Sequence, residues 1–226
     1  MTRGRAEEIT PAVFRVGGSD LSHGQDCLVY LVDLGDLVLI DCGAGAGWPR
    51  IRDNIASTGR DPAALHTLVL THGHVDHIGA TDRVVAESGC RVVAHAADVP
   101  AIESGDPAFT ASSWYGLDLP GYPVDHVVEG DEALAFAGGA LELLHTPGHT
   151  PGSLAAVLRG EETVLFGQDI HGPFDAAFAS DLPAYRRSME RLLALEADVL
   201  CEGHYGVYRP ASAVRRFIAG HLRDNS

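Results

Sequence analysis

Short apolar segments rich in β-branched residues recur along the whole chain and constrain its fold more than any other feature. Each has the length of a strand and is bounded by Gly, Pro, Asp or Asn. The predicted strands are 13–16, 27–34, 37–41, 66–70, 91–94, 140–145, 154–158, 163–166 and 198–201. Helices are predicted at 48–57, 80–88, 182–195 and 214–222. This order favours an α/β (α+β) arrangement in layers, with sheets inside and helices outside.

The segment 182–195 has the clearest helical pattern. Its apolar face is formed by Leu182, Tyr185, Met189, Leu192 and Leu193. Ser180 or Asp181 is a suitable N-cap, and Pro183 fits the first turn of a helix.

The charge of the chain limits the partners it can bind. There are 31 acidic and 16 basic side chains, a formal net charge of −15, and every basic residue is Arg. The absence of Lys excludes Schiff-base chemistry and a lysine P-loop. A protein without a basic patch is not expected to bind nucleic acid or an anionic membrane surface. The expected partner is a small-molecule substrate, and a homo-oligomer would be compatible with the sequence.

Residues 1–226 are expected to form a single domain in the cytoplasm. No apolar run reaches the roughly 18 residues that cross a bilayer, and the acidic N-terminal segment does not resemble a signal peptide. The widely spaced Cys27, Cys42, Cys90 and Cys201 are expected to be buried, reduced thiols.

Residues 71–79 carry the strongest local signal for chemistry. His72, His74, Asp76 and His77 lie in a loop between a predicted strand and a helix. Imidazole and carboxylate are natural ligands of a divalent metal such as zinc. In an extended backbone His72 and His74 point the same way, and Asp76 and His77 can address a second point nearby. The spacing therefore suggests two metals rather than one.

Three further residues follow predicted strands in the same manner. They are His149 in a turn bounded by Pro and Gly, Asp169 directly after a buried strand, and His204 after a strand and a Gly. Together with the first cluster they predict the rest of a coordination sphere.

In this order, the motifs resemble those of the metallo-β-lactamase-fold hydrolase superfamily, and Asp41 in the segment 39–43 matches its first motif. The resemblance covers about residues 27–204. It implies a four-layer αβ/βα sandwich with a metal site at one edge, between the sheets.

The resemblance also assigns roles to residues. It implies that His72, His74 and His149 bind a first metal, that Asp76, His77 and His204 bind a second, and that Asp169 bridges the two. Asp76 and Asp169 are therefore expected to be catalytic. Asp41 resembles the carboxylate that orients a ligand rather than a ligand itself.

The expected reaction is hydrolysis by a bridging hydroxide, because metals lower the pKa of bound water to near 7. Two divalent ions are expected, with zinc the first choice and iron or manganese also compatible with these ligands. An Asp at this motif, here Asp169, resembles the pattern of the glyoxalase-II-like and lactonase-like members rather than that of the β-lactam-hydrolysing ones. The expected substrate is therefore a thioester, a lactone or a related ester.

Two alternatives remain open at the level of sequence. One is a mononuclear iron persulfide dioxygenase that uses His72, His149 and Asp169. The other is a non-catalytic metal-binding protein on the same fold. The substrate itself depends on two loops rich in Gly, Pro and aromatic residues, 105–123 and 167–180, whose conformations the sequence does not predict.

Three residues are candidates for substrate contacts. His171 lies two positions after Asp169, where it could contact substrate or donate a proton. Tyr115 and Tyr205 are candidates to donate a hydrogen bond to a carbonyl oxygen.

Overall fold

The computed structural model describes residues 5–225 and places their strands in two sheets. The first sheet has the order β1-β2-β3-β4-β5-β6-β7, with bounds Glu7–Thr10, Val13–Gly17, Val29–Asp33, Leu37–Ile40, Leu65–Val69, Arg91–His95 and His126–Val128. The second has the order β13-β12-β11-β10-β9-β8. From β8 to β13 its strands are Glu132–Phe136, Gly139–His145, Leu154–Leu158, Val164–Gln168, Val199–Glu202 and Val207–Tyr208.

Strand directions follow from the connections between strands. β1 to β4 are antiparallel, whereas β4, β5, β6 and β7 run parallel to one another. Parallel neighbours require a crossover, and these crossovers carry α1 (Trp48–Ser57), α3 (Thr81–Ser88) and α4 (Val99–Ser104). In the second sheet β11 and β12 are parallel, and α6 (Leu182–Ala194) connects them. Several strands therefore end at the same edge of each sheet.

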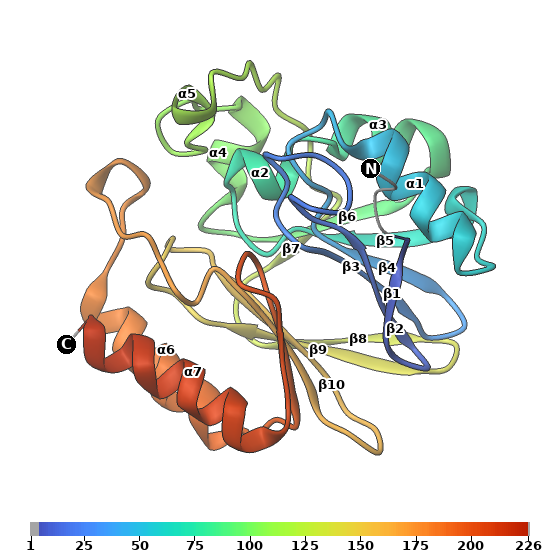
Figure 1. Cartoon of the computed structure of the whole chain (residues 1–226). Coiled ribbons are helices and arrows are strands. Elements are labelled where there is room, and N and C mark those ends of the chain that lie inside the picture. The colour runs from blue at the N-terminus through green and yellow to red at the C-terminus, as the bar shows by residue number, and fades with distance from the viewer. Residues whose placement is uncertain (1–4, 226) are drawn as a thin grey trace.

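The elements form four layers, with α1 and α3 above the first sheet and α6 and α7 (Ala211–Asp224) below the second (Figure 1). Three apolar clusters separate these layers. The central one lies between the sheets, where the rings of Tyr30 and Phe166 meet edge to face at 5.7 Å. The other two pack the helices against the outer sheet faces. The predicted α/β sandwich is confirmed.

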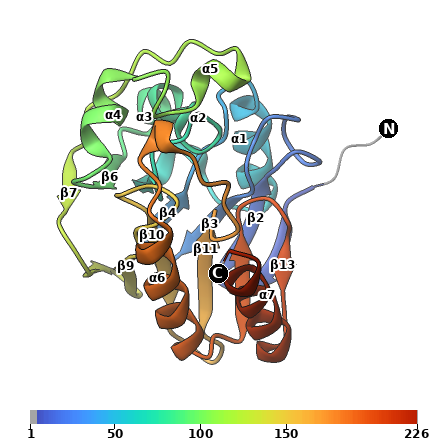
Figure 2. The same cartoon turned by 90° about the vertical axis from the view of Figure 1, so that its left-hand side faces the viewer.

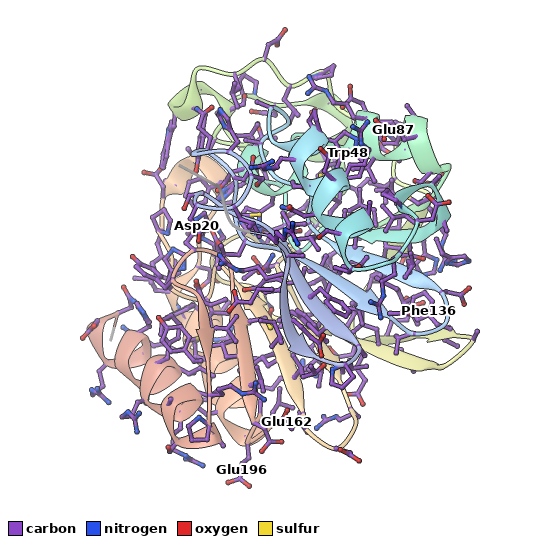
Figure 3. All side chains as sticks on the ribbon, turned by 45° about the vertical axis from the view of Figure 1, so that its right-hand side comes forward. Asp20, Trp48, Glu87, Phe136, Glu162 and Glu196 are labelled. Atoms are coloured by element: carbon purple, nitrogen blue, oxygen red, sulfur yellow. The ribbon has the colours of Figure 1, made fainter. Side chains whose placement is uncertain are left out.

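A polar contact ties two helices of the upper layer together. Trp48 is 2% exposed at the start of α1, and its Nε1 donates to Glu87 Oε1 of α3 at 3.0 Å (Figure 3). The indole thus buries its apolar body while its N–H keeps a partner.

The helix α6 begins as its sequence predicts. Asp181 is the N-cap, and its Oδ1 accepts from Ala184 N at 2.9 Å. Tyr185 and Met189 are buried against the second sheet, but Leu182 is 37% exposed. Leu182 is the first residue of α6, and its placement on the buried face was wrong.

The four strands that lie outside the predicted segments are β1, β7, β8 and β13. They are the outer strands of the two sheets. An edge strand pairs on one side only and is short and partly exposed, so it has no continuous apolar run.

The two loops of unpredicted conformation contain short helical turns. The segment 105–123 contains α5 (Ser112–Tyr115), and 167–180 contains the 3₁₀ turn η2 (Ala176–Phe178). The chain between β11 and α6, orange in Figure 2, extends from the second sheet toward α5. There the rings of Phe178 and Trp114 lie 5.6 Å apart. The two loops therefore meet at one end of the sandwich.

All four cysteines are buried and unpaired. Burial raises the pKa of the Cys42 and Cys201 thiols, which keeps them protonated.

Within residues 5–225, no helix is long and apolar enough to cross a membrane. The prediction of a single domain over 1–226 stays a prediction, and its ends, residues 1–4 and 226, lie outside the described residues.

Candidate metal centre

All seven predicted ligands lie together at the edge of the sandwich where the strands end. His72 and His74 follow β5, and Asp76 and His77 lie in the short helix α2 (Val75–Ile78). The other three come from the second sheet, where His149 follows β9, Asp169 follows β11 and His204 follows β12. Both sheets therefore contribute to one site.

His72, His74, His149 and Asp169 form the first ligand group, and all four are buried. His149 Nε2 lies 2.9 Å from His74 Nδ1 and 3.3 Å from His72 Nε2. Asp169 Oδ2 lies 3.6 Å from His149 Nε2 and 3.8 Å from His72 Nε2.

Asp76, His77 and His204 form the second ligand group. Asp76 Oδ2 lies 3.3 Å from His204 Nε2 and 3.7 Å from His77 Nε2. Asp169 Oδ1 lies 3.2 Å from both of these nitrogens. The two oxygens of Asp169 thus face different groups.

These donor atoms have the spacing of metal ligands. A tetrahedral site with metal–nitrogen bonds of about 2.05 Å separates its donors by about 3.3 Å, and both groups fall close to that value. The buried His77 Nε2 and Asp169 Oδ1 also have no hydrogen-bond partner among the described residues. Buried polar atoms rarely remain unpartnered unless they serve a function. The residues present therefore fit divalent metal ions.

Asp41 lies behind the second group and orients one of its histidines. Its Oδ2 is 2.7 Å from His77 Nδ1, and it also accepts from the Gln168 amide. Thr71 donates to the same carboxylate through its backbone N–H, at 2.8 Å, and its hydroxyl. The contact with Nδ1 leaves His77 Nε2 directed at the ligand group, as expected for a carboxylate that supports a ligand.

The turn that carries His149 requires close contact with α6. His149 Nδ1 donates to Pro173 O at 2.6 Å, which leaves Nε2 for the first group. Gly148 has φ +151°, and a Cβ there would lie 2.4 Å from Tyr185 Cα. Only glycine allows the turn to approach the helix so closely.

A cavity of about 370 Å³ opens onto both ligand groups. Its lining includes all three residues predicted to contact substrate: Tyr115, His171 and Tyr205. Tyr205 is 62% exposed at the mouth, and Tyr115 lies beside Asp76, whose charge helps burial to raise the pKa of the phenol. The structure therefore places the predicted contact residues around the predicted centre.

Comparison with known proteins identifies the family. The model of the metallo-β-lactamase superfamily matches residues 24–204. The chain belongs to the metallo-β-lactamase superfamily. The prediction of this family is confirmed. The family match supports the prediction of a metal-dependent hydrolase.

Two relatives of this superfamily member illustrate its similarity to other sequences. A probable metallo-hydrolase, YqgX of Bacillus subtilis, is 33% identical over 139 residues, covering 61% of this chain and 63% of that protein. The β-lactamase-like protein 2 homolog of Drosophila melanogaster is 28% identical over 211 residues, covering 88% and 66%. The match thus spans less than two thirds of either relative.

Among solved structures, the metallo-β-lactamase FEZ-1 of Legionella gormanii has a TM-score of 0.84 at 18% identity, covering 98% of this chain and 94% of that one. This likeness concerns the fold alone.

The two ligand groups of this superfamily member differ in electrostatics. Burial, together with the nearby His149 imidazole, lowers the pKa of His74 to about 3. Burial also opposes a charge on His204, but Asp169 and Asp76 outweigh it and raise the pKa of His204 to about 10. The first group therefore offers neutral imidazoles, whereas the second holds protons that a metal has to displace.

Asp98 was missed by the sequence analysis, yet it connects the two ligand loops. It is fully buried, and its Oδ2 accepts from Gly73 N at 3.0 Å and from Thr150 Oγ1 at 2.7 Å. Its Oδ1 accepts from Gly152 N at 2.7 Å. Like the predicted ligands, Asp98 closely follows a strand, β6, and this position is the signal that could have revealed it.

Glu202 was missed in the same way and supports the second group. It is fully buried, and its Oε2 accepts from His204 N at 2.7 Å and from Tyr205 N at 2.8 Å. Its Oε1 lies 2.5 Å from His171 Nδ1. One carboxylate thus holds both the His204 turn and the His171 ring.

Proposed function

We propose that this superfamily member hydrolyses a thioester, a lactone or a related ester of a small molecule, using two divalent metal ions, with zinc expected. The observation that carries the proposal is the position of Asp169, whose Oδ2 and Oδ1 face separate ligand groups. A carboxylate shared in this way is suited to two metals rather than one. The net charge of −15 supports a small-molecule substrate rather than a nucleic acid.

The protein's own contribution is to hold the donors in place before a substrate arrives. Asp41 orients His77, Asp98 joins the loops of His72 and His149, and Glu202 fixes the turn of His204. Divalent metals held by these ligands would supply hydroxide at neutral pH and polarise a carbonyl oxygen. Such preorganisation avoids reorganising the site during the reaction.

His171 is the protein group best placed to exchange a proton with the substrate. It lines the cavity, and its Nδ1 contacts Glu202. The other ring nitrogen, Nε2, is therefore the one that can exchange a proton with the substrate. Tyr115 and Tyr205 line the same cavity and supply hydroxyl groups that can donate to a substrate carbonyl.

Metal counting combined with a ligand variant tests the proposal. The metal content per chain and the hydrolysis of a panel of thioesters and lactones are measured for the wild type and for Asp76→Ala. We expect two equivalents in the wild type and one in the variant. We also expect a fall in kcat/KM of about a hundredfold or more, because a Lewis-acid metal contributes several kcal/mol. Asp53→Ala, which changes an exposed carboxylate with 63% side-chain exposure, is the matched control.

One metal equivalent in active wild-type protein, with Asp76→Ala unchanged in metal content and rate, would overturn the two-metal proposal. One equivalent of iron together with oxygen uptake on a persulfide would instead favour the dioxygenase alternative. No turnover of any ester by protein with two metals would overturn ester hydrolysis.

A further inference from the structure

Two exposed aromatic side chains line the cavity at the metal centre. Trp114 is 56% exposed and Tyr205 is 62% exposed, although large apolar side chains usually avoid water. The described residues include two other exposed large hydrophobic side chains, Val127 and Leu182. Neither of those lines the cavity above the metal centre, whereas Trp114 and Tyr205 both do.

Trp114 rests on a stack of rings that reaches the first ligand group. Its ring lies 5.6 Å from that of Phe178, at an angle of 64°. Phe178 is fully buried and contacts His74 at 4.4 Å and His149 at 5.5 Å between ring centroids. The position of Trp114 is therefore fixed relative to two ligands, although it belongs to a different loop.

Tyr205 rests on a second stack that reaches the other ligand group. Its ring meets that of His171 edge to face, at 4.8 Å and 90°, and the His171 ring lies 5.4 Å from that of His204. Behind Tyr205 lie Phe217 and His221 of α7, at 6.3 Å and 6.2 Å. These ring contacts hold Tyr205 in place.

Outside the metal centre, the described lining of the cavity has no Arg or Lys side chain that could bind an anionic substrate. Its described lining consists of histidines, the ligands Asp76 and Asp169, and apolar or aromatic residues. None of these is Arg, and the chain contains no Lys. Phosphorylated carriers are bound mainly through Arg or Lys. The lining is therefore suited to an uncharged group with an apolar or aromatic surface.

We propose that Trp114 and Tyr205 form an aromatic clamp that selects uncharged esters with an aromatic or bulky apolar acyl group beside the scissile carbonyl. The clamp rests on the proposed ester hydrolysis and adds the class of substrate to it. The acyl group would lie between the two rings, and a short acyl group would reach neither.

Kinetic selectivity tests the clamp in metal-loaded protein. The substrates are the phenylacetyl and acetyl thioesters of N-acetylcysteamine, together with phenylacetyl coenzyme A. We expect Trp114→Ala and Tyr205→Ala each to lower the ratio of kcat/KM for phenylacetyl over acetyl by about tenfold, mainly through KM. Trp114→Phe and Tyr205→Phe should restore most of the ratio, because they keep a ring. The control Val127→Ala removes an exposed apolar side chain outside the cavity and should leave the ratio unchanged.

Tryptophan fluorescence tests the clamp without any turnover. The chain has two tryptophans, the buried Trp48 and the exposed Trp114, so the cavity contains one of two emitters. Titration with the amide analogue of the phenylacetyl thioester should change the emission to saturation, in metal-free and in metal-loaded protein. Trp114→Phe should abolish the change while Trp48 still emits. Tyr205→Ala should raise the Kd of the amide, measured from the emission of Trp114, by about tenfold.

The outcomes separate the clamp from the proposed function. Ester hydrolysis with a phenylacetyl-to-acetyl ratio that neither alanine variant changes would overturn the clamp and leave the function standing. Equal or better turnover of the coenzyme A ester would also overturn it. Saturable binding of the amide at Trp114 in protein that hydrolyses no ester would support the clamp and overturn the function.

Discussion

The two ligand groups share Asp169 but are built differently. The first is enclosed: its residues are all buried, Phe178 covers two of its imidazoles, and Asp98 ties its loops together. The second is more open, because the His204 side chain is 31% exposed and depends on a turn held by Glu202. An enclosed set of donors that carry no proton should bind a metal more tightly than an open set that must first release protons. The comparison thus predicts an order of occupancy in which the first group fills first.

Substitution of a metal ligand should have the largest effect on metal content and activity, and the effect should differ between the two groups. We expect His72→Ala to lose both metals and essentially all activity, since the tighter site is destroyed. His204→Ala should keep about one metal per chain and lose about a hundredfold or more in rate. Metal content after dialysis and kcat/KM measure the two effects. Equal metal loss in both variants would contradict the predicted order, and His23→Ala, a histidine that belongs to neither ligand group, is the matched control.

The supporting carboxylates should give intermediate effects. Asp98→Asn keeps the shape but loses one of two acceptor oxygens, so we expect the affinity of the first metal to fall 10- to 100-fold, as is typical when a ligand's support is removed. Glu202→Gln should weaken the second metal by a similar factor and leave the first unchanged. Competition with a chelator measures both affinities. If Glu202→Gln weakened only the first metal, the assignment of supports to groups would be wrong.

The pH dependence of stability should show the smallest effect. Burial raises the pKa of Asp98 to about 6, above the 3.8 expected of an exposed Asp, although hydrogen bonds oppose the shift. The folded state therefore binds more protons than the unfolded state between these values. The contribution of Asp98 to stability should fall as pH rises from about 4 to 6, by up to about 3 kcal/mol. Urea unfolding of metal-free wild type and Asp98→Asn checks this, since the asparagine variant should lack that slope. Parallel pH profiles would contradict it.

The ligands could be predicted from the sequence because their chemistry is local. Four of them lie within six residues and form a recognisable motif: His72, His74, Asp76 and His77. The position of Asp98 after a strand could have marked it as a candidate, but its partners could not be predicted in the same way. Asp98 acts on Gly73 and Gly152, which lie 25 and 54 positions away, and no local pattern connects partners at those separations.

The aromatic loops illustrate a second limit. Their composition indicated loops on which the substrate depends, but the contact between Trp114 and Phe178 depends on how one loop crosses from the second sheet to α5. The edge strands were missed for a related reason, because β7 and β8 owe their structure to neighbours rather than to their own apolar content.

The division of the ligands between the two sheets has a mechanical consequence. Residues 72–77 belong to the half of the chain that builds the first sheet, and residues 149–204 to the half that builds the second. A metal held by His72 and His149 therefore fastens one half to the other. By mass action, a ligand at a hundred times its Kd stabilises the folded state by about 2.7 kcal/mol. Chelation would thus weaken the packing of the two sheets against each other as well as stop the reaction. A fragment that ends before β8 would carry only the ligands in residues 72–77.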